Sequence, residues 1–343
     1  MKKIIYLPFE HLPQRYTEMW NSSFRKELQP NDIVVRGDDS GSHIIQTGEF
    51  LDTFNTIRFK QSQISEAANM FQHKEINNGD VFFIPDIFYP GMEAIRYMAE
   101  LSGIKVGIVA FNHAGRADED DFVQNLNTWA DVQEQAWHDM SDIVLVGSQY
   151  HANRVKNKFK HNDVRVVGAI WDKEWMVKKT RHLPSKKEDY VIFPHRISKE
   201  KGIDLFLEIA RSNENLQFVI TSCGKGDLKG IELPNNVSYM PNLTKEQYFE
   251  IFKKARYYLS TAFQETFGYT VQEAIFFDCK IIAPNYASYP EYLNKCCLVE
   301  REDMSKQNFI QDKFLYDIDI DMSFQFEDNA KKIYKICEEL CIT

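Results

Sequence analysis

Short apolar runs alternate with longer amphipathic segments along most of the chain, and this alternation restricts the folds that the sequence can adopt. The short runs are typical of buried strands, and the longer segments carry apolar residues at helical spacing. Strands alternating with helices predict a mostly parallel sheet with helices on both faces, and such sheets bind ligands beyond the carboxyl ends of their strands. In the first half of the chain the predicted strands are Lys3–Leu7, Ile33–Val35, Asn55–Phe59, Val81–Pro85, Val106–Phe111, Ile143–Val146 and Val164–Val167, and the predicted helices are Tyr16–Leu28, Ile64–His73, Gly91–Ser102, Asp121–Met140 and Tyr150–Phe159.

The length of the chain, 343 residues, allows two domains of ordinary size. A lysine-rich segment of irregular pattern interrupts the alternation, and we interpret it as a linker. We therefore expect a first domain at 1–170, the linker at 171–189, a second domain at 190–325 and a final helix within 326–343. In the second domain and the final helix, strands are predicted at Tyr190–Pro194, Phe218–Thr221, Asn236–Tyr239, Tyr257–Thr261, Lys280–Ala283 and Cys296–Val299, and helices from Ile203, from a capping box of Thr244 and Gln247, at Phe267–Phe277 and at Asp328–Leu340.

The strand, loop and helix between Tyr257 and Tyr292 carry the clearest chemical pattern. The loop holds Glu265, and the helix that begins near Gly268 carries Glu273 one to two turns further on. A helix N-terminus offers unpaired N–H groups and a positive dipole end, which together bind phosphate, and glycine lets the backbone approach the ligand. The helix carboxylate can accept hydrogen bonds from a ribose diol, and the loop carboxylate can reach a neighbouring sugar. The pattern predicts a nucleotide-sugar site; the alternative is a pair of solvated surface glutamates.

The run ETFGYTVQE, followed by EA, a cysteine and APN…YPEY, resembles the donor-site signature of the retaining GT-B glycosyltransferases of family 4. With STA before it and PN…YPE after it, the run is most similar to the branch of the tRNA-queuosine mannosyltransferases, with phage DNA-modifying enzymes as further candidate relatives. The resemblance implies two Rossmann-like domains facing across a cleft and a C-terminal helix that crosses back to the first domain.

The resemblance also implies roles for individual residues. Arg196 and Lys201 match a pair that grips the donor pyrophosphate, and His113 matches a histidine that contacts the donor sugar. Positive groups beside a breaking phosphate ester stabilise the negative charge of the leaving diphosphate. The predicted catalytic residues are therefore His113, Arg196, Lys201 and Glu265, and the predicted donor-binding residues are Gly224, Thr266, Phe267, Gly268, Tyr269 and Glu273. Gly224 lies in a glycine-x-glycine run that is equally typical of an ordinary turn.

The loop after the first strand departs from the family pattern. Many relatives carry a glycine pair there for close approach to the diphosphate, whereas the segment Pro8–Arg15 contains no glycine. We predict that Glu10, His11 and Arg15 serve the acceptor instead, together with Arg116 after the fifth strand.

The overall charge gives little attraction for nucleic acid, because the formal net charge is −9. Local basic clusters nevertheless occur, and a protein that binds a flipped base needs only a local positive groove. The resemblance favours an acceptor hydroxyl on a modified nucleobase, in tRNA or in DNA such as the hydroxymethylated pyrimidines of phages. A glycan or lipid-linked polysaccharide is the alternative acceptor. The basic clusters, each of which could also be a solvated face, are Arg154, Lys156, Lys158, Lys160 and His161, and Lys178, Lys179, Arg181, His182, Lys186 and Lys187.

The resemblance implies a UDP- or GDP-sugar as donor substrate, retention at the anomeric carbon, and no obligatory metal or cofactor. The acidic run Asp317–Asp321 mimics a metal-binding D-x-D site, but its setting favours an exposed turn. The six cysteines lack paired C-x-x-C spacing, so we expect buried thiols. The rival functions are a nucleotide-sugar epimerase and an inactive nucleotide-sugar-binding module.

No apolar run approaches the length of a membrane span, and the N-terminus lacks the layout of a signal peptide. We therefore expect a cytoplasmic enzyme, of a bacterial cell or a phage-infected host, without a transmembrane segment. The oligomeric state stays open.

Overall fold

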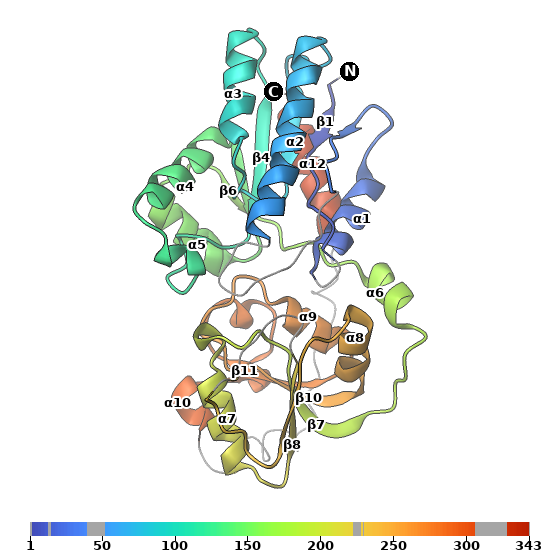
Figure 1. Cartoon of the computed structure of the whole chain (residues 1–343), viewed down its shortest axis with the longest axis vertical. Helices are drawn as coiled ribbons and strands as arrows, with labels where there is room; N and C mark the ends of the chain where they lie inside the picture. Colours follow the sequence, from blue (N-terminus) through green and yellow to red (C-terminus); the bar gives the residue numbers. More distant parts are fainter. Residues whose placement is uncertain are drawn as a thin grey trace. The chain divides into compact units, whose positions relative to one another are not determined.

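The computed structural model describes residues 2–12, 15–39, 52–221, 228, 230–305 and 328–342. The chain divides into two compact units, which are described separately (Figure 1). The first unit comprises residues 1–171 and 328–343, and the second comprises residues 172–327. Each unit is a parallel sheet covered by helices, as the alternation of strands and helices predicts.

The sheet of the first unit has the strand order β2-β1-β3-β4-β5-β6, and every adjacent pair is parallel. Its inner strands β3 and β5 are buried on both faces, which explains their unbroken apolar sequences. The order reverses between β1 and β3, and this switch point is where open parallel sheets bind ligands. The strands are β1 (Ile4–Tyr6), β2 (Ile33–Val34), β3 (Val81–Ile84), β4 (Gly107–Asn112), β5 (Ile143–Val146) and β6 (Val164–Val166).

The helices of the first unit include the last helix of the chain, α12, which lies against α1 (Figure 1). Tyr334 of α12 donates a hydrogen bond to Asp32 at 3.1 Å, and Asn329 donates one to the carbonyl of Ala169 at 2.8 Å. The helices are α1 (Thr17–Glu27), α2 (Thr53–Gln72), α3 (Met92–Leu101), the short 3₁₀ helix η1 (Phe122–Asn125), α4 (Trp129–Met140), α5 (Gln149–Phe159) and α12 (Asn329–Ile342).

One predicted strand, Asn55–Phe59, is wrong, because these residues lie inside α2. Asp52 caps that helix by accepting a hydrogen bond from the Asn55 N–H at 3.1 Å. The buried side chains of α2 then recur at helical spacing, and they include the polar residues Thr56, Lys60 and Gln63. Buried polar residues are uncommon, so the apolar pattern alone did not reveal this helical face.

The sheet of the second unit has the strand order β12-β11-β10-β7-β8-β9, again with parallel neighbours. Here the order reverses between β10 and β7, so the loops after these two strands flank the switch point. The strands are β7 (Glu188–Phe193), β8 (Gln217–Thr221), β9 (Val237–Met240), β10 (Ala255–Leu259), β11 (Lys280–Pro284) and β12 (Leu298–Val299). The helices are α6 (Lys173–Thr180), η2 (Lys199–Lys201), α7 (Ile203–Ser212), α8 (Lys245–Lys254), α9 (Tyr269–Phe276), η3 (Tyr289–Glu291), η4 (Lys295–Cys297) and α10 (Arg301–Met304).

The segment predicted to be an irregular linker contains helix α6 and the start of β7. Asp172 caps α6 by accepting a hydrogen bond from the Trp175 N–H at 2.8 Å. Lys253 of α8 donates hydrogen bonds to the carbonyls of Thr180 and Leu183 at 2.8 and 3.0 Å, so this segment belongs to the second unit. Its many exposed lysines hid the helical pattern in the sequence.

Two further findings concern the described residues as a whole. Among them, no helix has both the length and the apolar character needed to cross a membrane. The described cysteines form no disulfide bond with one another, and Cys296 is exposed whereas Cys279, Cys297, Cys337 and Cys341 are buried.

Candidate active site

Two loops of the second unit are bound to each other at the switch point of its sheet. One loop follows β7 and the other follows β10, the strand beside it. The Phe263 N–H donates a hydrogen bond to the Glu200 carbonyl at 2.9 Å. The Thr261 hydroxyl contacts the carbonyl oxygens of Gly202 and Lys201 at 2.8 and 3.1 Å. The two loops therefore form one fixed surface at the carboxyl edge of the sheet.

Gly202 makes this close approach possible. Its backbone has φ of 70°, and a Cβ atom there would lie 2.2 Å from the carbonyl oxygen of Thr261. A contact of that length with backbone is forbidden, and a left-handed φ is itself unfavourable for any residue with a side chain. The position therefore requires glycine.

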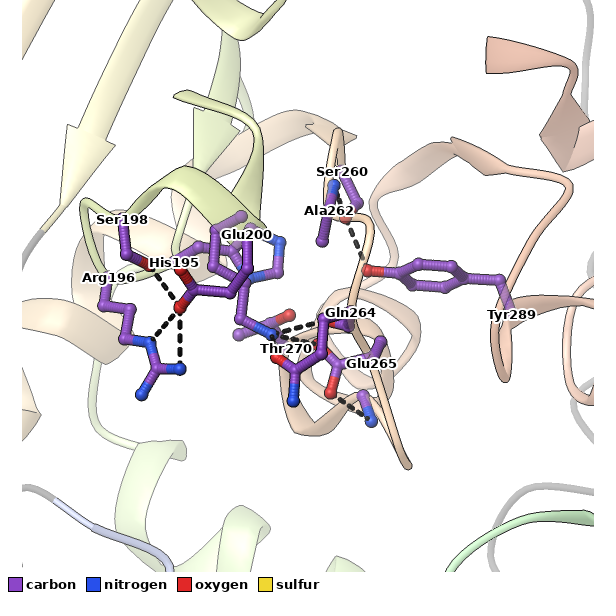
Figure 2. A network of polar contacts seen from close by, with 12 residues as sticks. His195, Arg196, Ser198, Glu200, Ser260, Ala262, Gln264, Glu265, Thr270 and Tyr289 are labelled. Atoms are coloured by element: carbon purple, nitrogen blue, oxygen red, sulfur yellow. Dashed lines mark hydrogen bonds and ion pairs between the residues drawn. The ribbon is translucent and has the colours of Figure 1, made fainter. Parts of the chain in front are cut away.

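The joined loops bring Lys201 and Glu265 together. The sequence predicts that both residues belong to one site, but it does not predict that their side chains pair. The Lys201 Nζ lies 2.6 Å from the Gln264 carbonyl oxygen and 3.3 Å from the Glu265 Oε2. The other Glu265 oxygen accepts the Gly268 N–H at 3.1 Å, at the start of α9 (Figure 2). Both charged side chains are mostly buried. An ammonium, a carboxylate and a helix N-terminus thus meet at one point.

Arg196 lies on the same loop as Lys201 and is held by one carboxylate. The Arg196 Nε lies 2.8 Å from Glu200 Oε1, and that oxygen also accepts the Ser198 hydroxyl at 2.6 Å (Figure 2). The Arg196 side chain remains 39% exposed, so its guanidinium can still bind an anion. The two predicted pyrophosphate-binding cations therefore lie on one loop, each fixed by a different glutamate.

The first turn of α9 is tied to the strands beneath it by a polar chain. The Tyr258 hydroxyl lies 2.9 Å from Thr270 Oγ1 and 3.3 Å from His195 Nε2. His195 is buried, and burial holds its pKa well below the ordinary value, so the imidazole is neutral. The predicted residues Thr266, Phe267 and Tyr269 flank this helix start.

Glu273 is buried in α9, and residues of α8 hold its carboxylate. The Tyr248 hydroxyl donates to Glu273 Oε2 at 2.5 Å, and Lys245 Nζ lies 3.3 Å from Oε1. The start of α8 is fixed by the predicted capping box, in which Thr244 and Gln247 exchange hydrogen bonds of 3.2 and 2.9 Å. Sequence reasoning missed Lys245 and Tyr248, although their i, i+3 spacing just after the cap places them on one helical face.

His113 lies in the first unit, after β4, in an aromatic surrounding formed by Phe9, Tyr16, Trp20 and Phe111. Its Nε2 is 2.9 Å from the Pro85 carbonyl oxygen, and a carbonyl accepts, so Nε2 carries the proton. Burial lowers the pKa of His113 to about 3. The imidazole is therefore neutral, and Nδ1 is its hydrogen-bond acceptor.

Arg116 is occupied by contacts within its own unit. Its Nε donates to Asp131 at 3.0 Å, and its Nη1 donates to the Val123 carbonyl at 2.8 Å. The Arg116 backbone N–H in turn contacts both oxygens of Glu134, at 3.1 and 3.0 Å. These contacts hold the loop that carries His113. Glu134 is buried, and burial raises its pKa to about 8.

The remaining predicted residues differ in burial, and some lie outside the described part of the chain. Glu10 is fully buried beside α2, His11 is exposed, and Arg15 is half-buried. Gly224 and the acidic run 317–321 lie outside the described residues. Among the described residues, no group of three His, Cys, Asp or Glu side chains is placed to share a metal ion.

At the end of β4, buried polar side chains form a series of hydrogen bonds that the sequence does not predict. Asn112 lies 3.0 Å from His138 Nε2 and 2.9 Å from His151 Nε2. Burial lowers the pKa of His138 to about 4 and that of His151 to about 3, so both rings are neutral. The chain links β4, α4 and α5 close to His113.

Comparison with known proteins shows which class of protein this chain is similar to. Residues 176–296 match the family model described as glycosyl transferases group 1. A comparison with curated proteins finds no match. Sucrose-phosphate synthase from Thermosynechococcus elongatus has a similar structure, with a TM-score of 0.62 and 12% identity over 100% of this chain and 97% of that chain.

Two further solved structures contain nucleotides. The pneumococcal O-GlcNAc transferase GtfA in complex with UDP and GlcNAc has a TM-score of 0.55 and 14% identity, over 82% of this chain and 60% of that chain. The structure described as trehalose-6-phosphate from E. coli bound with UDP-2-fluoro glucose has a TM-score of 0.60 and 11% identity, over 99% and 96%. The match to GtfA covers 60% of the GtfA chain, so this chain spans less than two thirds of it.

The two Rossmann-like units and these similarities define a GT-B fold. Residues 176–296, which lie in the second unit, are similar to the glycosyl transferases group 1 family.

We predict that Gly202→Ala lowers the free energy of unfolding by about 3 kcal/mol or more, because it adds both backbone strain and a clash with Thr261. Equilibrium denaturation with urea measures the change. Gly230→Ala is the matched control in the same unit: φ is 80°, but a Cβ there would meet no atom of the described residues within 4 Å. Equal losses in the two variants would contradict the proposed role of the contact between the loops.

We also predict that Glu134 makes stability depend on pH. Its pKa is raised from 4.5 to about 8, so the folded state holds its proton more tightly than the unfolded state does. The resulting stabilisation is present at low pH and is lost as the pH rises toward 8, at no more than about 1.4 kcal/mol per pH unit. The Tm of the wild type should therefore fall more steeply with rising pH than that of Glu134→Gln. Asp139→Asn, an exposed carboxylate on the same helix, should keep the wild-type slope.

Proposed function

We propose that the protein transfers a sugar from a UDP- or GDP-sugar to an acceptor hydroxyl with retention of the anomeric configuration. The observation that carries this proposal is the convergence of Arg196, Lys201 and Glu265 at the N-terminus of α9, where the strand order of the second sheet reverses. A phosphate-binding helix end, two cations and a carboxylate are the groups that a nucleoside diphosphate linked to a sugar needs.

In this proposal, the two cations bind the leaving diphosphate. Arg196 and Lys201 would neutralise the charge that develops on it, together with the backbone at Phe267 and Gly268. Each cation is already positioned by a glutamate, so little reorganisation is needed when the diphosphate binds. Thr266, Tyr269 and Gly224 complete the proposed donor-binding set.

In this proposal, the two carboxylates bind hydroxyl groups of the donor. Glu273 would bind the ribose diol with its remaining lone pairs, since Tyr248 and Lys245 fix both of its oxygens. Glu265 would bind hydroxyls of the transferred sugar, and His113 would contact that sugar through its neutral imidazole.

The contacts of Glu265 bear on how retention would be achieved. A carboxylate that is paired with an ammonium and accepts a backbone N–H is a weak nucleophile. We therefore propose that no enzyme residue attacks the sugar. The bond from the anomeric carbon to the diphosphate oxygen breaks, the acceptor oxygen bonds on the same face, and the acceptor proton passes to the leaving phosphate.

The proposed function is tested by incubating the protein with UDP-, GDP- and ADP-sugars, with and without tRNA and hydroxymethylated DNA. Release of nucleoside diphosphate is measured, and the anomeric configuration of the product is read by NMR. Acceptor-dependent release with a retained product is expected. An inverted product would overturn retention, an epimerised donor formed without acceptor would indicate an epimerase, and binding without turnover would indicate a binding module.

We predict that Lys201→Met and Glu273→Gln each reduce donor turnover by about 100-fold or more, because each removes a charged contact to the leaving group or to the ribose. Steady-state release of nucleoside diphosphate measures the loss. Lys254→Met is the matched control, since Lys254 pairs with Glu250 at 2.7 Å on α8, outside the proposed donor-binding set. A folded Lys201→Met variant with near-normal turnover would rule out the donor-site assignment.

We propose that the acceptor is a hydroxyl on a modified nucleobase, in DNA or tRNA. The supporting observation is the exposed lysines Lys156 and Lys160 at the end of α5. The neighbouring charges contribute less, because Lys158 pairs with Asp131 at 3.0 Å and Arg154 lies 3.6 Å from Glu119. A glycan acceptor is the alternative, and slow donor hydrolysis that neither nucleic acid stimulates would favour it.

For a nucleic-acid acceptor, we predict that Lys156→Gln combined with Lys160→Gln weakens binding and lowers the slope of log K against log salt by about 1 to 2. Fluorescence titration of hydroxymethylated DNA and tRNA at several salt concentrations measures both quantities. The double variant Lys74→Gln and Lys105→Gln is the control, because these exposed lysines follow other helices of the same unit, α2 and α3, and Lys74 shares the positive φ of Lys160. An unchanged slope would remove α5 from the acceptor site.

A further inference from the structure

The run YPEY, at residues 289–292, has no role in the proposed function, although it belongs to the pattern that resembles a donor-site signature. It follows β11, and its first residue, Tyr289, begins the short helix η3. The Tyr289 side chain is fully buried. A buried phenol needs a hydrogen-bond partner for its hydroxyl, so the partner of Tyr289 indicates what this residue does.

That partner is Ser260, in the loop that carries Glu265. The Tyr289 hydroxyl lies 2.5 Å from the Ser260 Oγ, and Ser260 is also fully buried (Figure 2). The same Ser260 oxygen accepts the Ala262 N–H at 3.4 Å. Tyr289 therefore contacts this loop through the side chain that holds its backbone.

The loop is thus held from both neighbouring strands. On the side of β7, it is bonded to the turn that carries Lys201. On the side of β11, the Ser260 N–H donates to the Ile282 carbonyl at 3.0 Å, and Tyr289 holds the Ser260 hydroxyl. Glu265 follows directly after the segment that these contacts fix.

A second phenol ties this cluster to α9 and to the loop after β7. Tyr258 forms hydrogen bonds with Ser260 and Tyr289, as well as with Thr270 and His195. Thr270 lies in the first turn of α9, and His195 lies in the loop after β7. One buried group of side chains therefore touches all the elements that carry the cations and the loop carboxylate of the proposed donor site.

The Tyr289 phenol keeps its proton at neutral pH. Burial raises its pKa well above the ordinary value, and the negative charge of Glu265 adds to the rise. A neutral hydroxyl holds Ser260 without pairing with Lys201. The Lys201 ammonium is thus left to Glu265 and to the Gln264 carbonyl.

We propose that Tyr289 is a positioning residue of the donor site, which fixes the loop of Glu265 by holding the Ser260 hydroxyl. The inference rests on the proposed function, because it assigns Tyr289 to the same site. Tyr289 is fully buried, so it acts through Ser260 and the loop backbone and not by contact with the donor. Removing its hydroxyl should leave nucleotide binding nearly unchanged and slow the step that needs Glu265 in place.

The variant Tyr289→Phe tests the proposal, because it keeps the ring and removes only the hydroxyl. Steady-state release of nucleoside diphosphate should show kcat lowered by about 10-fold, whereas the calorimetric Kd of UDP or GDP should change by less than about 2-fold. An unchanged kcat would overturn the proposal. A Kd weakened as much as kcat falls would also overturn it, because a general loss of the folded site affects both quantities.

Tyr190→Phe is the matched control. Tyr190 is half-buried in β7 of the same unit, and its hydroxyl donates to the Ile251 carbonyl, outside the proposed donor-binding set. Both variants lose one hydroxyl hydrogen bond, so both should lower the Tm, but only Tyr289→Phe should lower kcat. An equal loss of kcat in the control would make Tyr289 a residue of general stability and overturn the proposal.

A double-mutant cycle tests whether Tyr289 acts through Ser260. Ser260→Ala removes the other half of the contact and the acceptor of the Ala262 N–H, so it should lower kcat at least as much as Tyr289→Phe does. Adding Tyr289→Phe to Ser260→Ala should then have no further effect. Additive losses would show that Tyr289 acts by another route and would overturn the proposal.

Hydrogen exchange tests the loop without any donor. The Ala262 amide should exchange up to about 10-fold faster in Tyr289→Phe than in the wild type, and at the wild-type rate in Tyr190→Phe. Unchanged exchange in Tyr289→Phe would overturn the proposal. If the wild type turns over no nucleotide-sugar, the proposed function fails, whereas the exchange rates still decide whether Tyr289 holds the loop, so the two failures are distinguished.

Discussion

The proposed donor site depends on the contact between the backbone of Gly202 and that of Thr261. Two loops from adjacent parallel strands can share a surface only if one of them has no side chain at the point of contact. With that contact made, Lys201 contacts Glu265, and Glu265 accepts the N–H of Gly268, the N-cap of α9. Because the ion pair is mostly buried, its geometry is held by packing and not by the pair alone. The arrangement of these charged groups is therefore a consequence of the backbone as much as of the charges.

Four glutamates of this chain have the same side chain and different chemistry, because their partners differ. Glu265 is compensated by a lysine and a backbone N–H, and Glu273 by a phenol and a second lysine. Glu134 is buried against a backbone N–H, and burial raises its pKa to about 8, so it is largely protonated at neutral pH. Glu10 has a donor on one oxygen and none on the other among the described residues. A pattern of glutamates in a sequence therefore does not specify function until the partners are known.

The sequence predicts the elements well, because alternation of strands and helices is a local property. The strands on both sides of the two switch points are present close to their predicted ends, and so is the capping box at Thr244. The error at Asn55–Phe59 has a physical cause: the buried face of α2 is partly polar, and an apolar pattern cannot mark it. The proposed donor-site residues between Glu265 and Glu273 belong to a compact motif whose spacing is local, and their role stays a prediction.

The contacts that complete these sites could not be predicted, because they join positions far apart in the chain. Tyr248 and Glu273 are separated by 25 residues, and Glu10 and Thr56 by 46. Nothing in the local sequence around Glu134 indicates that its carboxylate lies under the backbone of Arg116. Such pairings are set by strand order and helix placement, which a single sequence specifies only through the whole fold.

The two switch points differ in how far their charged residues are exposed. In the second unit, Arg196 and Lys201 are each paired with a glutamate, and both pairs lie beside a helix N-terminus, which favours an anion. Arg196 remains 39% exposed, so its guanidinium is accessible. In the first unit, Lys60 and Asp86 form an ion pair whose side chains are almost fully buried, and Glu10 adds a fully buried carboxylate. The exposed cation and the helix end therefore make the second switch point the better place for a diphosphate, which is where the proposed function puts it.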